Sequence, residues 1–237
     1  MSPNPPFDLH TFTDNASQAA ALATRIAQQL DEAIRSRGRA SLAVSGGSTP
    51  KALFDALAQH LLDWSRVSIT LVDERWVPES DARSNARLVR THLLQDRAKA
   101  AHFVPLFNAE RSPEAGAQHT AAALSVLQWP LDVVVLGMGE DGHTASFFPG
   151  GDHLDAALNP NAAARVLSMR APGAGEPRIT LTLPVLATAR SMHLLLTGAT
   201  KAVMIEALAR ADDQAMRWPI ATVLHAARER PEVFWSP

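Results

Sequence analysis

Residues 131–151, LDVVVLGMGEDGHTASFFPGG, decide how the chain is interpreted. The apolar run from Val133 to Leu136 predicts a strand buried on both faces, as in a parallel sheet. Residues 137–142 match the G-x-G-x-x-G pattern of a dinucleotide-binding turn, and His143 follows directly. The stretch therefore raises a choice between a turn that binds a dinucleotide and a turn that presents a histidine.

The residues around the glycines argue against a dinucleotide. The helix after such a turn must run several turns, because its N-terminus binds the pyrophosphate. Here Pro149-Gly150-Gly151 ends any helix early, and Glu140 and Asp141 add negative charge where a pyrophosphate would lie. Asp155, the nearest candidate for a ribose-binding acid, follows no expected strand. We interpret the glycine pattern as an accidental match.

Apolar runs and helical patterns alternate along the rest of the chain. The expected strands are residues 41–44, 67–72, 133–136, 166–169, 179–183 and 193–196, with extended pieces at 103–106 and 233–235. The expected helices are residues 14–37, capped by Asp14, 50–62, capped by Thr49, 84–94, capped by Ser84, 112–127 and 200–208. This alternation predicts an α/β fold with a mostly parallel, Rossmann-like sheet covered on both faces. We expect one domain over residues 1–237.

The composition excludes several classes of function. A net charge of −2 gives no field that favours nucleic acid or an anionic membrane. The absence of cysteine excludes disulfides, thiolate zinc sites and cysteine nucleophiles. The nine histidines have no metal-ligand spacing, so no metal is expected. The N-terminal MSPNPPFDLHTF has neither the basic start nor the apolar core of a signal peptide, which predicts a cytoplasmic protein.

Loops after the expected strands carry polar residues that a ligand could use. In an open parallel sheet, ligands bind beyond the carboxyl ends of the strands. After the strand at 41–44 comes Ser45-Gly46-Gly47-Ser48-Thr49, whose hydroxyls and backbone N–H groups could converge on one anion. The sequence alone leaves open whether this loop binds phosphate or is only a tight turn before a helix.

Charged residues follow other strands in the same way. Asp73-Glu74-Arg75 closes the strand at 67–72, and its three charges must be solvated, paired or used. Arg75 could bind a phosphate with its guanidinium group. Lys201 lies in the first turn of a helix, where an anion would compensate for the helix dipole. Arg178, at the start of a strand, is either a ligand-binding cation at the rim or an ordinary surface charge.

Six segments together resemble the 6-phosphogluconolactonase family. They are Ser45-Gly-Gly-Ser-Thr-Pro50, Asp73-Glu-Arg-Trp-Val-Pro78, Ser84-Asn85 followed by Arg90, Gly137-Met-Gly-Glu-Asp-Gly-His-Thr-Ala-Ser-Phe-Phe-Pro149, Arg178-Ile-Thr-Leu-Thr-Leu-Pro-Val-Leu186 and Gly198-Ala-Thr-Lys201. The resemblance covers about residues 45–205, and its most specific block is Gly142-His-Thr-Ala-Ser146. It implies a three-layer α/β/α fold, no cofactor, and hydrolysis of 6-phospho-D-glucono-1,5-lactone in the oxidative pentose phosphate pathway.

The resemblance also suggests a role in the reaction for each candidate residue. His143 would act as general base on a water, since histidine ordinarily titrates near neutral pH. Asp141 would orient the imidazole, and Asp73 the sugar hydroxyls. The remaining candidates for substrate and phosphate binding are Ser45, Gly46, Gly47, Ser48, Thr49, Arg75, Arg178 and Lys201. Backbone N–H groups near Gly46 or Gly142 are candidates for stabilising the oxyanion.

Two other functions remain open for these residues. The glucosamine-6-phosphate deaminases share the superfamily, but in their pattern isoleucine, alanine, phenylalanine, asparagine and glutamate follow the histidine, whereas Thr144 to Phe148 follow it here. The sequence thus favours the lactonase. A sensor of sugar phosphates could use the same pocket without turnover, although it would not need Asp141 and His143. The expected partner is a small sugar-phosphate lactone, with the protein a monomer or small homo-oligomer.

Overall fold

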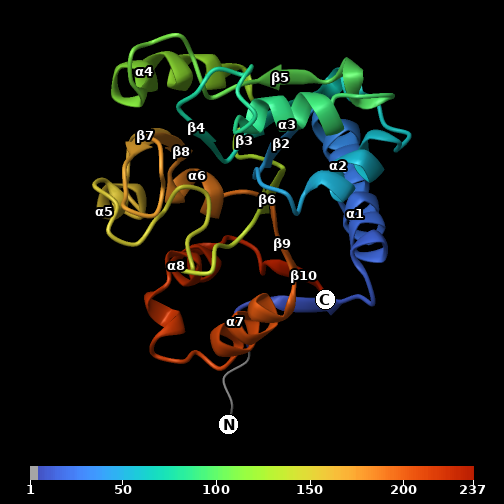
Figure 1. The fold of residues 1–237 in the computed structure, drawn as a ribbon. Helices are drawn as coiled ribbons and strands as arrows, with labels where there is room; N and C mark the ends of the chain where they lie inside the picture. The colour runs from blue at the N-terminus through green and yellow to red at the C-terminus, as the bar shows by residue number, and fades with distance from the viewer. Residues whose placement is uncertain (1–4) are drawn as a thin grey trace.

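A seven-stranded sheet runs through the centre of the molecule, with the strands in the order β1-β10-β9-β6-β2-β3-β5 (Figure 1). The computed structural model describes residues 5–237, so the first four residues of the expected domain lie outside the described residues. Every pair of neighbouring strands in this sheet is parallel. The strands are β1 (Asp8–Thr11), β2 (Ala40–Val44), β3 (Val67–Leu71), β5 (His102–Val104), β6 (Val133–Leu136), β9 (Ser191–Thr197) and β10 (Glu232–Ser236).

Helices cover both faces of this sheet, which confirms the α/β fold expected from the sequence. Figure 1 shows α1 and α2 on one side and α6 and α8 on the other. The helices are α1 (Asn15–Arg37), α2 (Lys51–Ala58), α3 (Asn85–His92), α4 (Pro113–Ala123), α5 (Leu154–Ala157), α6 (Leu183–Ala187), α7 (Ala199–Ala209) and α8 (Pro219–Ala226). None of the helices within residues 5–237 is long and apolar enough to cross a membrane.

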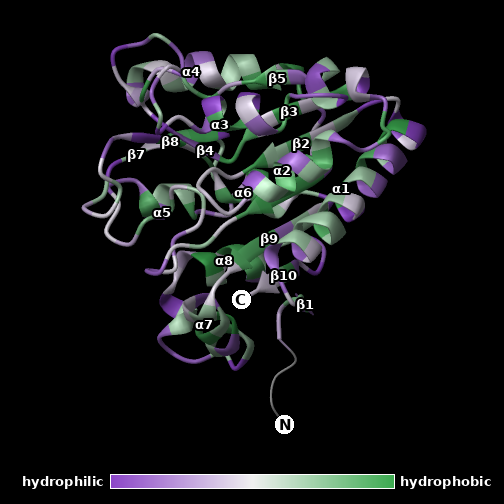
Figure 2. Ribbon diagram, turned by 45° about the vertical axis from the view of Figure 1, so that its right-hand side comes forward, coloured by the Kyte–Doolittle hydropathy of each residue, from purple (hydrophilic) through white to green (hydrophobic). Residues whose placement is uncertain are grey.

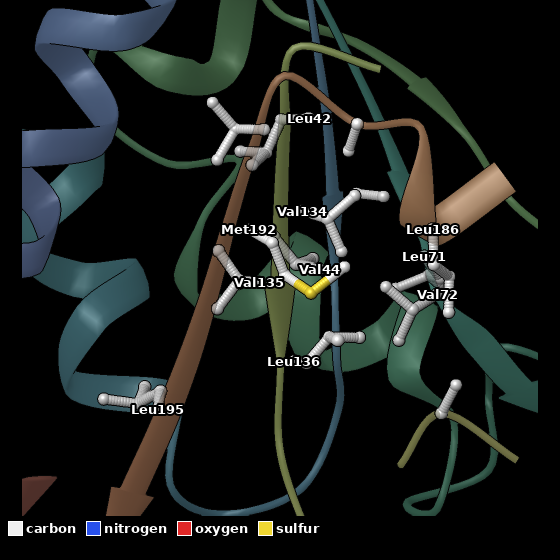
Figure 3. Packing of buried hydrophobic residues seen from close by; sticks show 14 of the residues in the cluster. Leu42, Val44, Leu71, Val72, Val134, Val135, Leu136, Leu186, Met192 and Leu195 are labelled. Carbon is white, nitrogen blue, oxygen red and sulfur yellow. The ribbon is translucent and has the colours of Figure 1, made fainter. Parts of the chain in front are cut away.

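The central strands are buried because helices pack on both of their faces. All residues of β2 and β6 are buried, which is why these strands are continuous apolar runs in the sequence rather than alternating patterns. Figure 2 shows the corresponding apolar centre and the polar outer surface of helices such as α1. Side chains from neighbouring strands and from α6 meet in this core (Figure 3), among them Leu42, Val44, Leu71, Val134, Val135, Leu136, Leu186, Met192 and Leu195.

Three short strands form a second sheet, which the sequence did not predict. β4 (Asp73–Arg75), β8 (Arg178–Leu181) and β7 (Val166–Met169) pair antiparallel in the order β4-β8-β7. The strands expected at 166–169 and 179–183 therefore do not join the parallel sheet. A parallel crossover requires about a dozen residues, and the loop between β7 and β8 is shorter than that.

The sequence predicted the starts of α1, α3, α4 and α7 closely, but it placed the start of α2 one residue early and did not predict α5, α6 and α8. Asp14, Ser84 and Ser112 each accept a hydrogen bond from a backbone N–H in the first turn of α1, α3 and α4. Thr49 was expected to cap α2, but the helix begins one residue later, after Pro50, without a side-chain cap. Thr49 lies instead on the wall of a cavity.

The glycine pattern after β6 does not begin a helix. The Gly139 N–H donates to the His143 carbonyl at 2.8 Å and the Gly142 N–H to the Gly139 carbonyl at 3.1 Å, so the segment is a compact turn. The next helix, α5, has four residues and starts at Leu154. A pyrophosphate site at a helix N-terminus is therefore excluded here, as the sequence indicated.

A buried histidine joins strands and a helix at the amino-terminal side of the sheet. His193 on β9 is 0% exposed; its Nε2 lies 2.7 Å from Gln29 Oε1 of α1, and its Nδ1 lies 3.2 Å from Glu232 Oε2 of β10. Burial lowers the pKa of His193, against the hydrogen bond and charge of Glu232. The hydrogen bond from His193 in turn helps to lower the pKa of Glu232 to about 2.

These shifts predict a loss of stability in mild acid. Because the pKa of His193 is lower in the folded than in the unfolded chain, below about pH 6.5 the unfolded chain binds more protons. The free energy of unfolding should fall as pH falls from 6.5 towards 5, a range above the ordinary pKa of a carboxyl group. In His193→Gln, urea unfolding at pH 7 and pH 5 should differ less than in the wild type.

The same substitution at exposed His102 is the control and should leave the wild-type pH dependence in place. An unchanged pH dependence in His193→Gln would assign the acid sensitivity to other groups.

Candidate active site

A cavity of about 350 Å³ opens at the carboxyl ends of β2, β6 and β9. Loops from both sheets line it, so segments far apart in the sequence meet there. All but one of the residues selected from the sequence lie on its wall: Ser45, Gly46, Gly47, Ser48, Thr49, Asp73, Arg75, His143, Arg178 and Lys201. The exception, Asp141, lies directly behind His143.

The loop from Ser45 to Thr49 presents unpaired backbone N–H groups. The Ser45 N–H donates to Val135 on β6, but within residues 5–237 the N–H groups of Gly46, Gly47, Ser48 and Thr49 have no hydrogen-bond partner. Successive free N–H groups on a cavity wall form a concave site suited to an anion. The structure thus favours an anion site over a simple tight turn.

Gly46 is required because the backbone passes directly against Asn85. A Cβ at Gly46 would overlap with the Asn85 side-chain amide, which also lines the cavity. The Asn85 Nδ2 donates to the Asp73 carbonyl at 2.9 Å. Asn85 therefore fixes the distance between the Ser45–Thr49 loop and the start of β4.

Glu74 has a structural use that the sequence left open. Its side chain is fully buried and accepts hydrogen bonds from the N–H groups of Arg75, Asn85 and Ala86 and from the Ser84 hydroxyl, all between 2.8 and 3.1 Å. Burial raises the pKa of Glu74, against the lowering effect of these N–H groups. The carboxylate thereby ties the N-terminus of α3 to β4.

Asp73 connects the two sheets at the cavity. Its Oδ2 accepts a hydrogen bond of 2.6 Å from the buried Ser146 hydroxyl and lies 3.8 Å from Arg178 Nη1. Within residues 5–237, no hydrogen bond reaches Oδ1. Since Asp73 also lines the cavity, this oxygen could accept a hydrogen bond from a ligand hydroxyl.

Two arginines stand side by side on the second sheet. Arg75 and Arg178 are directly opposite in the antiparallel register of β4 and β8. The Nε atom of each is buried and has no partner within the described residues. Burial, together with the charge of Arg75, lowers the pKa of Arg178, although Asp73 opposes the shift. An anionic ligand would satisfy both guanidinium groups.

His143 is held at its inner nitrogen. The ring atom Nδ1 lies 2.5 Å from Asp141 Oδ1, and the backbone N–H of His143 donates to the same carboxylate oxygen at 3.1 Å. Burial raises the pKa of Asp141, but the hydrogen bonds and charge of His143 outweigh it and lower the pKa below its ordinary value. An ionised Asp141 would favour the tautomer that carries hydrogen on Nδ1 and has Nε2 unprotonated.

The C-terminal segment supports this histidine loop. The Ile220 N–H donates to the Gly142 carbonyl at 3.1 Å. Gly142 has φ +77°, and a Cβ there would overlap with the Trp218 side chain. Because the Gly142 N–H is already used within the turn, it is not free for an oxyanion, and Gly46 is the better candidate.

Lys201 completes the wall from the main sheet. It follows Gly198 and β9 in the first turn of α7, as the sequence indicated. Burial lowers the pKa of Lys201, while the charges of Glu140 and Asp141 oppose the shift. An anion in the cavity would favour the charged ammonium group.

Arg90, which belongs to one of the segments that resemble the family, lies outside the cavity wall. It pairs with Glu79 at 2.5 Å and lies over the Phe103 ring.

Sequence reasoning gave no role to four residues that support the site. They are Asn85, Ser146, Phe148 and Trp218. The first three occur in the segments that carry the family resemblance, which was the available signal for them.

Comparisons with known proteins agree on one family. Residues 13–235 match the family described as glucosamine-6-phosphate isomerases/6-phosphogluconolactonase. A 6-phosphogluconolactonase of Rhizobium meliloti is 48% identical, covering 97% of this chain and 99% of its own, and one of Mesorhizobium japonicum is 48% identical, covering 98% and 96%. The crystal structure of a 6-phosphogluconolactonase from Shewanella baltica superposes with a TM-score of 0.90 at 45% identity, covering 98% of each chain.

The four hydrogen bonds to Glu74 predict a large effect of an isosteric change. In Glu74→Gln one carboxylate oxygen becomes an amide N–H₂ group that faces other donors, which leaves buried groups without an acceptor. We expect the free energy of unfolding in urea to fall by about 2 kcal/mol.

The matched control is Glu79→Gln, which removes a half-exposed ion pair and should cost less than about 1 kcal/mol. Equal losses in the two variants would contradict the role assigned to Glu74.

Proposed function

Since the chain belongs to the family of glucosamine-6-phosphate isomerases and 6-phosphogluconolactonases, we propose that it hydrolyses 6-phospho-D-glucono-1,5-lactone to 6-phospho-D-gluconate. This is the second reaction of the oxidative pentose phosphate pathway. The observation that carries the proposal is the composition of one cavity, which combines an imidazole, three cations and a run of N–H groups that have no partner among residues 5–237. The near-complete coverage of relatives named 6-phosphogluconolactonase supports it.

His143 is proposed to activate the attacking water. The Asp141 carboxylate engages Nδ1, so Nε2 takes the proton as the water oxygen attacks the lactone carbonyl. The C1–O bond of the ring then breaks, and the proton returns to the leaving ring oxygen, which becomes the C5 hydroxyl. Free N–H groups of the Ser45–Thr49 loop, with Gly46 the first candidate, would stabilise the oxyanion.

The cations are proposed to bind the phosphate at the other end of the substrate. Arg75 and Arg178 line the cavity from the second sheet, and Lys201 offers an ammonium group from the main sheet. Asp73 would accept a hydrogen bond from a sugar hydroxyl through Oδ1. The substrate would thus span the two sheets, with its ester near His143.

The base assignment predicts a specific loss in His143→Gln. Glutamine cannot take up the proton, so kcat should fall by about 10²- to 10⁴-fold while 6-phosphogluconate still binds. The assay generates the lactone from glucose 6-phosphate with a dehydrogenase and follows its loss above the spontaneous rate.

Exposed His119 provides the control, since His119→Gln should have wild-type kcat. A folded His143→Gln enzyme with normal turnover would remove the base assignment. Binding of 6-phosphogluconate by the wild type without any turnover would identify a sensor instead.

The phosphate assignment predicts weaker binding rather than slower chemistry. Lys201→Met keeps most of the length of the side chain and removes its charge, so the Kd for 6-phosphogluconate should rise about tenfold to a hundredfold in calorimetry. Lys99→Met, at an exposed position away from the cavity, should bind as tightly as the wild type. If Lys201→Met also binds as tightly, Lys201 does not hold the phosphate.

A further inference from the structure

Phe148 contacts both the proposed base and one of the proposed phosphate-binding cations. Its side chain is 3% exposed and lines the cavity. Its ring centroid lies 4.2 Å from that of His143, with an angle of 30° between the ring planes. The Arg178 guanidinium carbon lies 5.4 Å from the same centroid, over the ring.

The contact with His143 supplies a constraint that Asp141 does not. The hydrogen bond at Nδ1 holds one edge of the imidazole against Asp141 Oδ1 and does not contact the face of the ring. The Phe148 ring stacks on that face and opposes a tilt of the imidazole. Together the two contacts determine where Nε2 points, and Nε2 is the atom that must meet the water.

The contact with Arg178 supplies a second constraint. The Arg178 Nη2 donates to the Ala174 carbonyl at 2.7 Å, and its Nη1 lies 3.8 Å from Asp73. The Phe148 ring borders the guanidinium group, as in a cation–π contact. One side chain therefore borders the groups proposed to act at opposite ends of the substrate.

We propose that Phe148 is a positioning residue. Its ring sets the plane of the His143 imidazole and holds the Arg178 guanidinium group in place, so that the distance and orientation between the base and the cation stay fixed. This inference rests on the proposed function. It assigns Phe148 no bond to the substrate and no proton transfer.

Phe148→Leu tests this role, because leucine keeps an apolar side chain of similar size and removes the aromatic face. We expect kcat for lactone hydrolysis to fall about tenfold or more, since small displacements of a reacting group are costly. KM should rise by no more than about threefold, the share expected from a lost cation–π contact. Phe148→Met should behave in the same way, which keeps the test available if the leucine variant does not fold. Phe148→Tyr retains the ring and should restore kcat.

Phe147→Leu is the matched control. Phe147 is the adjacent residue, fully buried, and does not line the cavity. Its replacement should lower the Tm while kcat stays at the wild-type value. A fall in kcat as large as that of Phe148→Leu would mean that packing of the whole segment matters, and would overturn a specific role for Phe148.

Nuclear magnetic resonance provides a readout that does not depend on activity. The ring-proton signals of His143, assigned by their loss in His143→Gln, should carry a ring-current shift in the wild type and in Phe148→Tyr. That shift should disappear in Phe148→Leu. Unchanged His143 signals together with an unchanged kcat in Phe148→Leu would overturn the proposal. If the wild type has no lactonase activity, the proposed function fails, and the resonance experiment still reports on the contact.

Discussion

The parallel pairing of β2, β6 and β9 is the constraint on which the rest of the structure depends. Val44 pairs with Val135, and Leu136 with Leu194, so the three strands end close together at one edge. Both faces are covered by helices, so a shift of register would bring side chains of the wrong size and shape against the packed helices on each side. The Ser45–Thr49 loop, the His143 turn and the start of α7 are thereby delivered to the same cavity, although they are widely separated in the sequence.

The main sheet supplies only part of this cavity, and the second sheet supplies the rest. N–H groups, the imidazole and Lys201 come from loops of the parallel sheet, whereas Asp73, Arg75 and Arg178 come from β4 and β8. The sheets are joined by the Leu181 N–H, which donates to the Val72 carbonyl at 2.9 Å, and by the bond between Ser146 and Asp73. Because β4 begins only one residue after Val72, the arginines cannot shift far relative to the loops of the main sheet.

The sequence predicted what depends on local pattern and missed what depends on distant partners. Apolar runs predicted β2 and β6, and a capping serine predicted the start of α3, because each of these signals lies within a few residues of the element that it predicts. The second sheet was missed because strand pairing partners are not encoded locally. The sequence around Glu74 suggests only a surface charge, because its partners are backbone N–H groups of α3 that approach it in the folded chain. Ser146 acts on a residue 73 positions away in the sequence, so only the family resemblance marked its segment.

The cations also have an electrostatic cost that bears on how the cavity works. Burial lowers the pKa of both Arg178 and Lys201, which means that their charged forms are poorly solvated at the cavity wall. Asp73, whose Oδ2 accepts from Ser146 and lies 3.8 Å from Arg178, opposes the shift of Arg178 only in part, and Glu140 and Asp141 do the same for Lys201. A phosphate dianion would replace the missing solvation of these groups and of the Ser45–Thr49 N–H groups at once. In the proposed function, binding energy at the phosphate end would hold the lactone against His143, and a sugar without a phosphate would gain none of this energy.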